Sequence, residues 1–149
     1  LDKLRAAYRE LRGSATVEPF FDDIPDILGN SHLVISRAGA SSVAELAAAG
    51  RAAILVPLPS AVDDHQTANA HQLANIGGGL CRAEAELDAA SLAADISNLF
   101  GDGEQLAQMG HNARKLAMPD AAKAIADYAL ALGDNNSQQP TLSISGGQS

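Results

Sequence analysis

The sequence changes from a strand pattern to a helix pattern within one stretch, residues 36–50, which reads SRAGASSVAELAAAG. The short apolar run Leu33-Val34-Ile35 directly before it is rich in β-branched residues, which is typical of a strand. Apolar side chains then recur at helical spacing, and Gly50 is a suitable residue to end a helix. The stretch therefore predicts a strand, a tight turn and a helix in succession.

The predicted turn consists of small residues, among which Gly39 allows the backbone to approach a ligand closely. Ser41 and Ser42 are good N-cap residues, and Glu45 lies beside the capping-box position. A helix that begins behind such a turn presents free N–H groups and the positive end of its dipole, which favour an anion. The element can hold a phosphate, but its spacing also fits a plain connection. It matches neither G-x-G-x-x-G nor a Walker loop, so it predicts neither a dinucleotide cofactor nor an NTPase.

A second strand and a second helix follow. Residues 53–59, AILVPLP, form a continuous apolar run that ends at two prolines and suits a parallel strand buried on both faces. Residues 63–70, DDHQTANA, then open a helix. Polar amide side chains at the end of a buried strand suit a hydroxyl-rich ligand, because ligands of open α/β sheets bind beyond the carboxyl ends of the strands.

The rest of the chain continues this alternation. Strands are predicted over residues 16–19, 33–36, 53–57 and 80–82. Helices are predicted over residues 1–12, 22–28, 42–49, 66–76, 87–100, 104–118 and 120–132. Asp88 or an adjacent residue is expected to cap the helix over residues 87–100. Alternating strands and helices predict right-handed crossovers and a parallel sheet, which is the α/β class. From Gly133 onward the sequence lacks core residues, which predicts a disordered tail over residues 133–149.

Charge and composition argue against several function classes. Lys and Arg number 10 against 18 Asp and Glu, so the formal net charge of −8 argues against a nucleic-acid partner and against docking on an anionic membrane by charge. The histidines lack the spacing of metal ligands, and the single Cys81 is expected to be a small buried hydrophobe. The adjacent acids at 22–23 and 63–64 fit helix capping better than the paired carboxylates of a glycoside hydrolase.

Taken together and in this order, the segments SRAGASSVAELAAAG, ILVPLP and DDHQTANA resemble the nucleotide-sugar-binding half of the MurG family of bacterial glycosyltransferases. Upstream, residues 20–24 (FFDDI) are similar to the family's F-x-D-D-M segment, and residues 118–122 (MPDAA) are similar to its last-helix region. The resemblance covers residues 15–132, with two small departures. Ala52 stands where the family often has proline, and Ser42 stands where threonine is common.

The resemblance implies the C-terminal domain of a GT-B glycosyltransferase, with a Rossmann-like parallel sheet flanked by helices. Residues 1–132 are then expected to be the UDP-GlcNAc-binding domain, truncated at its N-terminal side, and residues 133–149 its tail. The amphipathic pattern of residues 1–11 fits the end of a helix whose strand lies upstream. A length of 149 residues is that of one domain, whereas the family enzyme has two.

The resemblance also implies an activity: transfer of GlcNAc from UDP-GlcNAc to lipid I, with inversion, to form lipid II in peptidoglycan synthesis. No metal and no other cofactor is expected. The lipid I acceptor, the catalytic base and the contact with the cytoplasmic face of the plasma membrane are expected in a preceding half, so no catalytic residue is assigned. Two alternatives stay open: a stand-alone nucleotide-sugar-binding subunit of a split glycosyltransferase, and a related transferase acting on a lipid or natural product.

Several residues are implied to bind the donor, each with a separate part of the molecule. Glu45 is expected to bind the ribose hydroxyls, and the backbone of Phe21 the uracil ring. Gln66 and Asn69 are expected at the sugar, while Ser41, Ser42 and the Ala40 N–H hold the diphosphate. The full set implied is Phe21, Arg37, Gly39, Ala40, Ser41, Ser42, Glu45, His65, Gln66 and Asn69.

Four of these residues have an equally simple structural interpretation. Arg37 could reach a phosphate or pair with a nearby acid. Glu45 could be a capping or solvated acid, Gln66 could cap its helix, and Asn69 could bond to a neighbouring loop.

Overall fold

The computed structural model describes residues 1–11, 15–59 and 64–136. The chain divides into two units, Leu1–Ala117 and Met118–Ser149, and each is described by itself. No helix in the described ranges combines the length and the apolar character that crossing a bilayer requires. Asp63 and residues 137–149, which include most of the predicted tail, lie outside the described residues.

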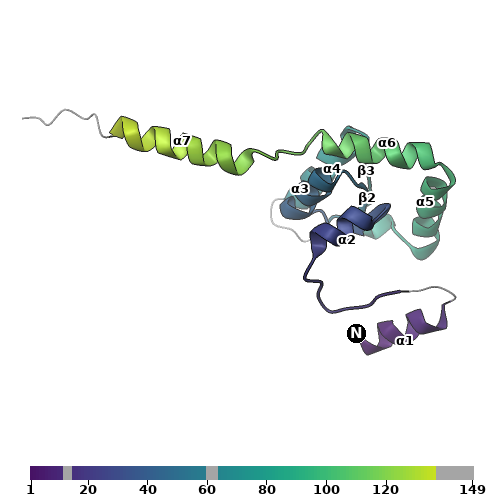
Figure 1. The fold of residues 1–149 in the computed structure, drawn as a ribbon. Helices are drawn as coiled ribbons and strands as arrows, with labels where there is room; N and C mark the ends of the chain where they lie inside the picture. Colours follow the sequence, from purple (N-terminus) through teal and green to yellow (C-terminus); the bar gives the residue numbers. More distant parts are fainter. Residues whose placement is uncertain (12–14, 60–63, 137–149) are drawn as a thin grey trace, which may run out of the picture. The chain divides into compact units, whose positions relative to one another are not determined.

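The first unit alternates helices and strands as the sequence predicts (Figure 1). Its elements are α1 (Asp2–Glu10), α2 (Ile24–Asn30), β1 (Leu33–Ser36), α3 (Ala40–Ala49), β2 (Ala52–Leu55), α4 (His65–Asn75), β3 (Gly79–Cys81), the 3-10 helix η2 (Glu84–Glu86), α5 (Ala89–Gly101) and α6 (Gly103–Arg114). The second unit contains α7 (Ala121–Asn136), which continues four residues beyond the predicted helix end at Leu132.

The three strands form one parallel sheet in the order β1-β2-β3, which confirms the predicted α/β class. Leu33 pairs with Ala52, and Ala53 pairs with Gly79. The ladder continues one residue past the strands, since the Val56 N–H donates to the Ser36 carbonyl at 2.9 Å. The carboxyl ends of all three strands are therefore aligned at one edge of the sheet.

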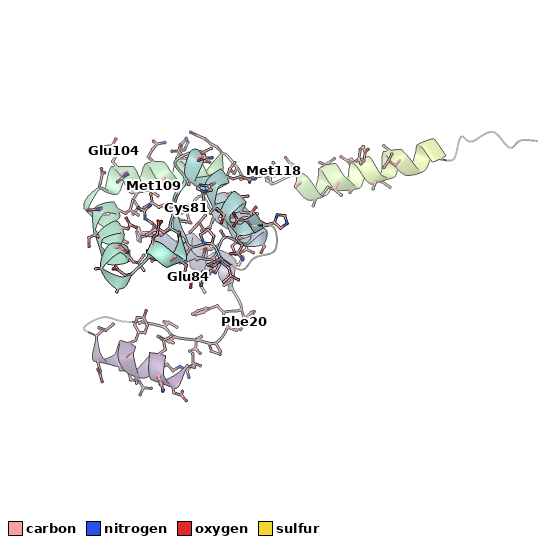
Figure 2. All side chains as sticks on the ribbon, turned by 180° about the vertical axis from the view of Figure 1, so that it is seen from behind. Phe20, Cys81, Glu84, Glu104, Met109 and Met118 are labelled. Carbon is pink, nitrogen blue, oxygen red and sulfur yellow. The ribbon has the colours of Figure 1, made fainter. Side chains whose placement is uncertain are left out.

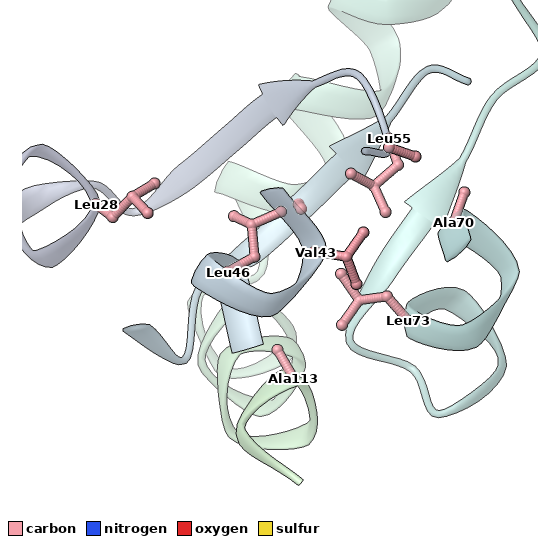
Figure 3. Close-up of a cluster of buried hydrophobic side chains, with 9 residues drawn as sticks. Leu28, Val43, Leu46, Leu55, Ala70, Leu73 and Ala113 are labelled. Carbon is pink, nitrogen blue, oxygen red and sulfur yellow. The ribbon is translucent and has the colours of Figure 1, made fainter. Parts of the chain in front are cut away.

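The central strand β2 is buried on both faces, as its apolar sequence predicts. Its four residues are each at most 1% exposed. Ala53 and Leu55 pack into a cluster with α3 and α4 (Figure 3), whereas Ala52 and Ile54 pack with α5 and α6. Figure 1 shows α3 and α4 on one side of the strands and α5 on the other. The first cluster comprises Leu28, Ala38, Val43, Leu46, Ala53, Leu55, Ala70, Leu73 and Ala113.

Aspartates cap three of the helices, each by accepting from the backbone N–H three residues on. Asp23 caps α2 at 3.1 Å, Asp88 caps α5 at 2.7 Å, and Asp102 caps α6 at 2.9 Å. The cap at Asp88 confirms the prediction, and that at Asp23 confirms the capping interpretation of the acids at 22–23. The interpretation is wrong for Asp64, which stands at the N-cap of α4 but makes no side-chain cap hydrogen bond among the described residues. The neighbouring N–H groups hold the pKa of Asp88 below its ordinary value.

The structure also differs from the prediction at residues 16–19, at the start of α3 and at the end of α6, which stops at Arg114 instead of Met118. Residues 16–19 do not form a strand: the Val17 carbonyl accepts from Arg5 Nε at 3.0 Å, and Pro19 has no N–H to donate to a ladder. Helix α3 begins at Ala40, two residues earlier than predicted, with Gly39 at the N-cap. The predicted caps Ser41 and Ser42 are therefore wrong, because both residues lie inside the first helical turn.

Cys81 ends β3 and is half-buried against the first cluster, in keeping with its predicted role as a small hydrophobe. Burial raises the pKa of its thiol.

At the C-terminal end of α3, Gly50 closes the helix in the left-handed conformation, with φ 62°, as predicted.

We predict that Gly110→Ala destabilises the first unit. A Cβ at Gly110, on α6, would lie 2.6 Å from the Gly50 carbonyl oxygen, so the helix must move away from α3. The free energy of unfolding in urea should fall by about 1–3 kcal/mol. Gly101→Ala is the matched control, because a Cβ there meets no atom of the described residues within 4 Å. Equal urea midpoints for the two variants would contradict the close contact.

Candidate functional site

The carboxyl edge of the sheet is where two helices begin. Ser36, Leu55 and Cys81 are in register across β1, β2 and β3, so the segments that follow them lie at the same edge. Helix α3 starts there after β1, and α4 starts there after β2. This is the edge at which the sequence predicts ligand binding.

The N-terminus of α3 presents three backbone N–H groups without an intrahelical acceptor. The first bond of the helix runs from the Val43 N–H to the Gly39 carbonyl at 3.0 Å. The N–H groups of Ala40, Ser41 and Ser42 precede it, and no acceptor for them lies among the described residues. Because α3 starts earlier than predicted, these serines add their own N–H groups to the anion-binding end and do not cap it.

Gly39 keeps the space in front of this helix open. Its φ of −60° and ψ of 151° are accessible to any residue, so the backbone does not require glycine. Apart from its chain neighbours and the helix backbone, a Cβ at this position would contact only the Ser42 hydroxyl oxygen, at 3.7 Å, among the residues that the structure describes. Neither conformation nor internal packing explains a glycine here, whereas a ligand approaching the helix end would.

Gln66 and Asn69 form hydrogen bonds with the backbone of the turn after β1. The Gln66 side-chain oxygen accepts from the Ala38 N–H at 3.3 Å and from the Leu58 N–H at 3.0 Å. Asn69 Nδ2 donates to the Ala38 carbonyl at 3.1 Å, so both backbone groups of the buried Ala38 are bound by α4. The loop-bonding interpretation of Asn69 is confirmed. Two backbone donors fix the oxygen of Gln66, so its amide nitrogen points elsewhere, with no acceptor among the described residues.

Arg37 pairs with an acid, which is one of the two roles that the sequence left open. Nη1 lies 2.8 Å from Glu84 Oε2, and Nη2 lies 3.2 Å from Oε1. Nη1 also donates to the carbonyls of Val56 and Pro57, at 3.3 Å each. The hydrogen bond between the two side chains raises the pKa of Arg37 and lowers that of Glu84.

Three other predicted residues lie on three different segments of the chain. Glu45 is exposed one turn after Ser41 on α3, at the spacing that puts both on one face. His65 is exposed and begins α4. Phe21 is half-buried in the extended segment before α2, and no hydrogen bond or ion pair joins it to the other predicted residues in the part of the chain that the structure describes.

Cavities open at both edges of the sheet. At the carboxyl edge, one of about 400 Å³ lies between Ile35, Arg37 and Glu84, and one of about 370 Å³ lies between Pro57, His71 and Cys81. A larger cavity of about 510 Å³ at the opposite edge is lined by Arg51 and His32.

We place the site at the carboxyl edge although its cavities are smaller, because the free helix N–H groups lie there. At the opposite edge, two arginines donate hydrogen bonds to carbonyls at helix C-termini. Arg51 donates to the Gly29 carbonyl, and Arg114 donates to the Ala49 carbonyl at 3.4 Å.

The sequence did not single out Glu84. It lies 47 residues after Arg37 and three residues past the end of β3, so only the register of the sheet brings the two together. An acid shortly after a third strand, with a lone arginine directly after the first, is the signal that could have indicated the pair.

Comparison with known proteins identifies the family of this chain. Residues 2–125 match the glycosyltransferase family 28 C-terminal domain. The UDP-N-acetylglucosamine–N-acetylmuramyl-(pentapeptide) pyrophosphoryl-undecaprenol N-acetylglucosamine transferase of Paramagnetospirillum magneticum is 48% identical over 137 residues, or 92% of this chain. The protein of the same name from Rhodospirillum rubrum is 44% identical over 91% of the chain.

A solved structure is similar as well. The crystal structure of Acinetobacter baumannii MurG matches with a TM-score of 0.81 and 36% identity, over 87% of this chain and 40% of that one. The chain spans 37% and 35% of the length of the two relatives above. With a family match over residues 2–125 and the same fold in a solved relative, the chain belongs to the glycosyltransferase family 28 C-terminal domain family.

Proposed function

We propose that this chain is the donor-binding half of an inverting N-acetylglucosaminyltransferase that moves GlcNAc from UDP-GlcNAc to lipid I, forming lipid II in peptidoglycan synthesis. The observation that carries the proposal is the N-terminus of α3 at the carboxyl edge, where three N–H groups find no acceptor within the described part of the chain and follow a glycine that its backbone conformation does not require. The names of the relatives supply the sugar, the acceptor and the reaction.

The chemical task of this half is to stabilise the leaving group. Negative charge grows on the β-phosphate as the bond to the sugar breaks, and UDP departs. N–H groups that already point at that position stabilise the charge without reorganising. The N–H groups of residues 40–42 and the positive end of the helix dipole supply this stabilisation.

We assign the remaining donor contacts from the resemblance to the family. Glu45 binds the ribose hydroxyls, Phe21 binds uracil through its backbone, and His65 lies beside the diphosphate at the start of α4. Gln66 and Asn69 hold the sugar side, Gln66 through its amide nitrogen. The lipid I acceptor and the catalytic base belong to a preceding half, as does the contact with the cytoplasmic face of the plasma membrane.

Nucleotide selectivity tests the proposal most directly. In calorimetric titrations the chain should bind UDP in clear preference to ADP and GDP, because a mismatched base edge leaves buried polar groups unpaired at about 1–3 kcal/mol each. UDP-GlcNAc should compete with UDP for a single site. A chain that binds the three nucleotides equally, or none of them, would refute the donor-binding role.

Substitution of Glu45 tests the ribose contact. Glu45→Ala should weaken UDP binding about tenfold or more, since a hydrogen bond to a charged group contributes about 1.5–3 kcal/mol. Thermal unfolding should be unchanged, because Glu45 is exposed. Glu104→Ala removes an exposed acid from the first turn of another helix, α6, and should leave the affinity for UDP unaltered. An unchanged dissociation constant for Glu45→Ala would exclude this contact.

Two substitutions of Gln66 separate its structural role from its proposed sugar contact. Gln66→Ala removes an acceptor from two backbone N–H groups and should lower the free energy of unfolding by about 1–2 kcal/mol. Gln66→Glu keeps an acceptor oxygen but loses the amide donor. Its stability should therefore be preserved, while its affinity for UDP-GlcNAc relative to UDP falls about fivefold.

The added charge works against the expected fall in the ratio, because UDP carries one more negative charge than UDP-GlcNAc and is repelled more strongly, so a fall reports the lost amide donor. Gln72→Ala, an exposed glutamine on the same helix, is the control for both measurements. An unchanged ratio in Gln66→Glu would leave Gln66 a purely structural residue.

A further inference from the structure

One guanidinium joins the segments that follow all three strands. Arg37 comes directly after β1 and donates to the carbonyls of Val56 and Pro57, which follow β2, at 3.3 Å each. It also binds Glu84, which follows β3, at 2.8 Å. Through these bonds Arg37 lies across the edge at which α3 begins. Figure 2 labels Glu84, which is well separated from Glu104 on α6.

The contact with Glu84 fixes the plane of the guanidinium. Two parallel N–H···O bonds, of 2.8 and 3.2 Å, join Nη1 and Nη2 to the two carboxylate oxygens. A bidentate pair of this kind sets orientation as well as distance. The side chains are 47% and 46% exposed, and pairs this exposed contribute little to folding stability. The geometry of the pair is therefore its more important property.

Part of the guanidinium stays unused. An arginine has five N–H donors, and here Nη1 and one Nη2 hydrogen serve Glu84 and the two carbonyls. The Nε–H and the second Nη2 hydrogen have no acceptor in the described ranges. Two fixed donors thus remain two residues before the N-cap of α3.

A second bidentate pair in the same unit provides a contrast. Arg82 binds Asp95 through Nε and Nη2, at 2.7 and 2.8 Å, and so joins the end of β3 to α5. Asp95 is only 16% exposed, and this pair uses the Nε donor that Arg37 leaves unused. The two pairs are alike in type, but only Glu84 binds an arginine that borders the open end of α3.

We propose that Glu84 is a positioning residue of the donor site, which holds Arg37 across the strand ends so that its unused N–H groups donate to the diphosphate of the nucleotide. This inference rests on the proposed function. Without Glu84, the guanidinium would keep only its Nη1 bonds to the two carbonyls. Its plane would then have to be ordered when the ligand binds, and the entropy of that ordering would weaken the complex.

The test is a calorimetric comparison of Glu84→Ala with Asp95→Ala in the 149-residue chain. Glu84→Ala should weaken UDP binding about fivefold, within the range of coupling between residues in contact. Uridine, measured by competition, has no diphosphate and should bind within about twofold of wild type in the same comparison. Asp95→Ala breaks an equally bidentate pair and should leave the affinity for UDP unchanged.

A double-substitution cycle shows whether Glu84 acts through Arg37. In the Arg37→Ala background, Glu84→Ala should cause no further loss of UDP affinity. In the wild-type background, Glu84→Gln keeps one acceptor oxygen, so its UDP affinity should lie between those of the wild type and Glu84→Ala. Three outcomes would each overturn the inference. Glu84→Ala could bind UDP as tightly as the wild type or more tightly, it could lose as much affinity for uridine as for UDP, or it could lose further UDP affinity in the Arg37→Ala background. A wild-type chain that fails to bind UDP would overturn the proposed function as well.

Discussion

The double burial of β2 is the constraint on which the rest of the first unit depends. Its residues are at most 1% exposed, and alternate side chains pack into the two hydrophobic clusters on opposite faces of the sheet. Burying Ile54 and Leu55 contributes about 1.5–3 kcal/mol each. The two alanines beside them leave room for helices on both faces, and Gly110 of α6 lies close enough to the Gly50 carbonyl that a Cβ would not fit.

A fixed central strand also fixes what lies at its carboxyl end. A one-residue slip of β2 would move every side chain into the opposite hydrophobic cluster, so packing on both faces fixes the register of the strand. The carbonyls of Val56 and Pro57 therefore have fixed positions, and Arg37 binds them there. From the next helix, Gln66 and Asn69 bind the two backbone groups of Ala38. The turn before α3 is thereby held from both sides, and the N-terminus of that helix stays open.

The sequence predicted the parts of this arrangement that depend on local pattern. The apolar run of β2, the alternation of elements, the cap at Asp88 and the C-terminal Gly50 are each encoded within a few residues. The start of α3 was mispredicted because serine suits an N-cap and a first helical turn alike. The Arg37–Glu84 pair was missed because it depends on strand register, which a local pattern does not contain.

The structural and the ligand-binding interpretations of the polar residues at this edge are not exclusive. The side-chain oxygen of Gln66 accepts from two backbone N–H groups, while its amide nitrogen has no acceptor among the described residues. Arg37 donates to Glu84 through Nη1 and Nη2, and two of its N–H groups have no acceptor in the same ranges. Ordering a flexible side chain during binding costs about 0.5–1.5 kcal/mol. If the proposed function holds, these internal bonds meet that cost when the chain folds. A side chain half-bound by the protein is then a better donor to a nucleotide sugar than one that is entirely free.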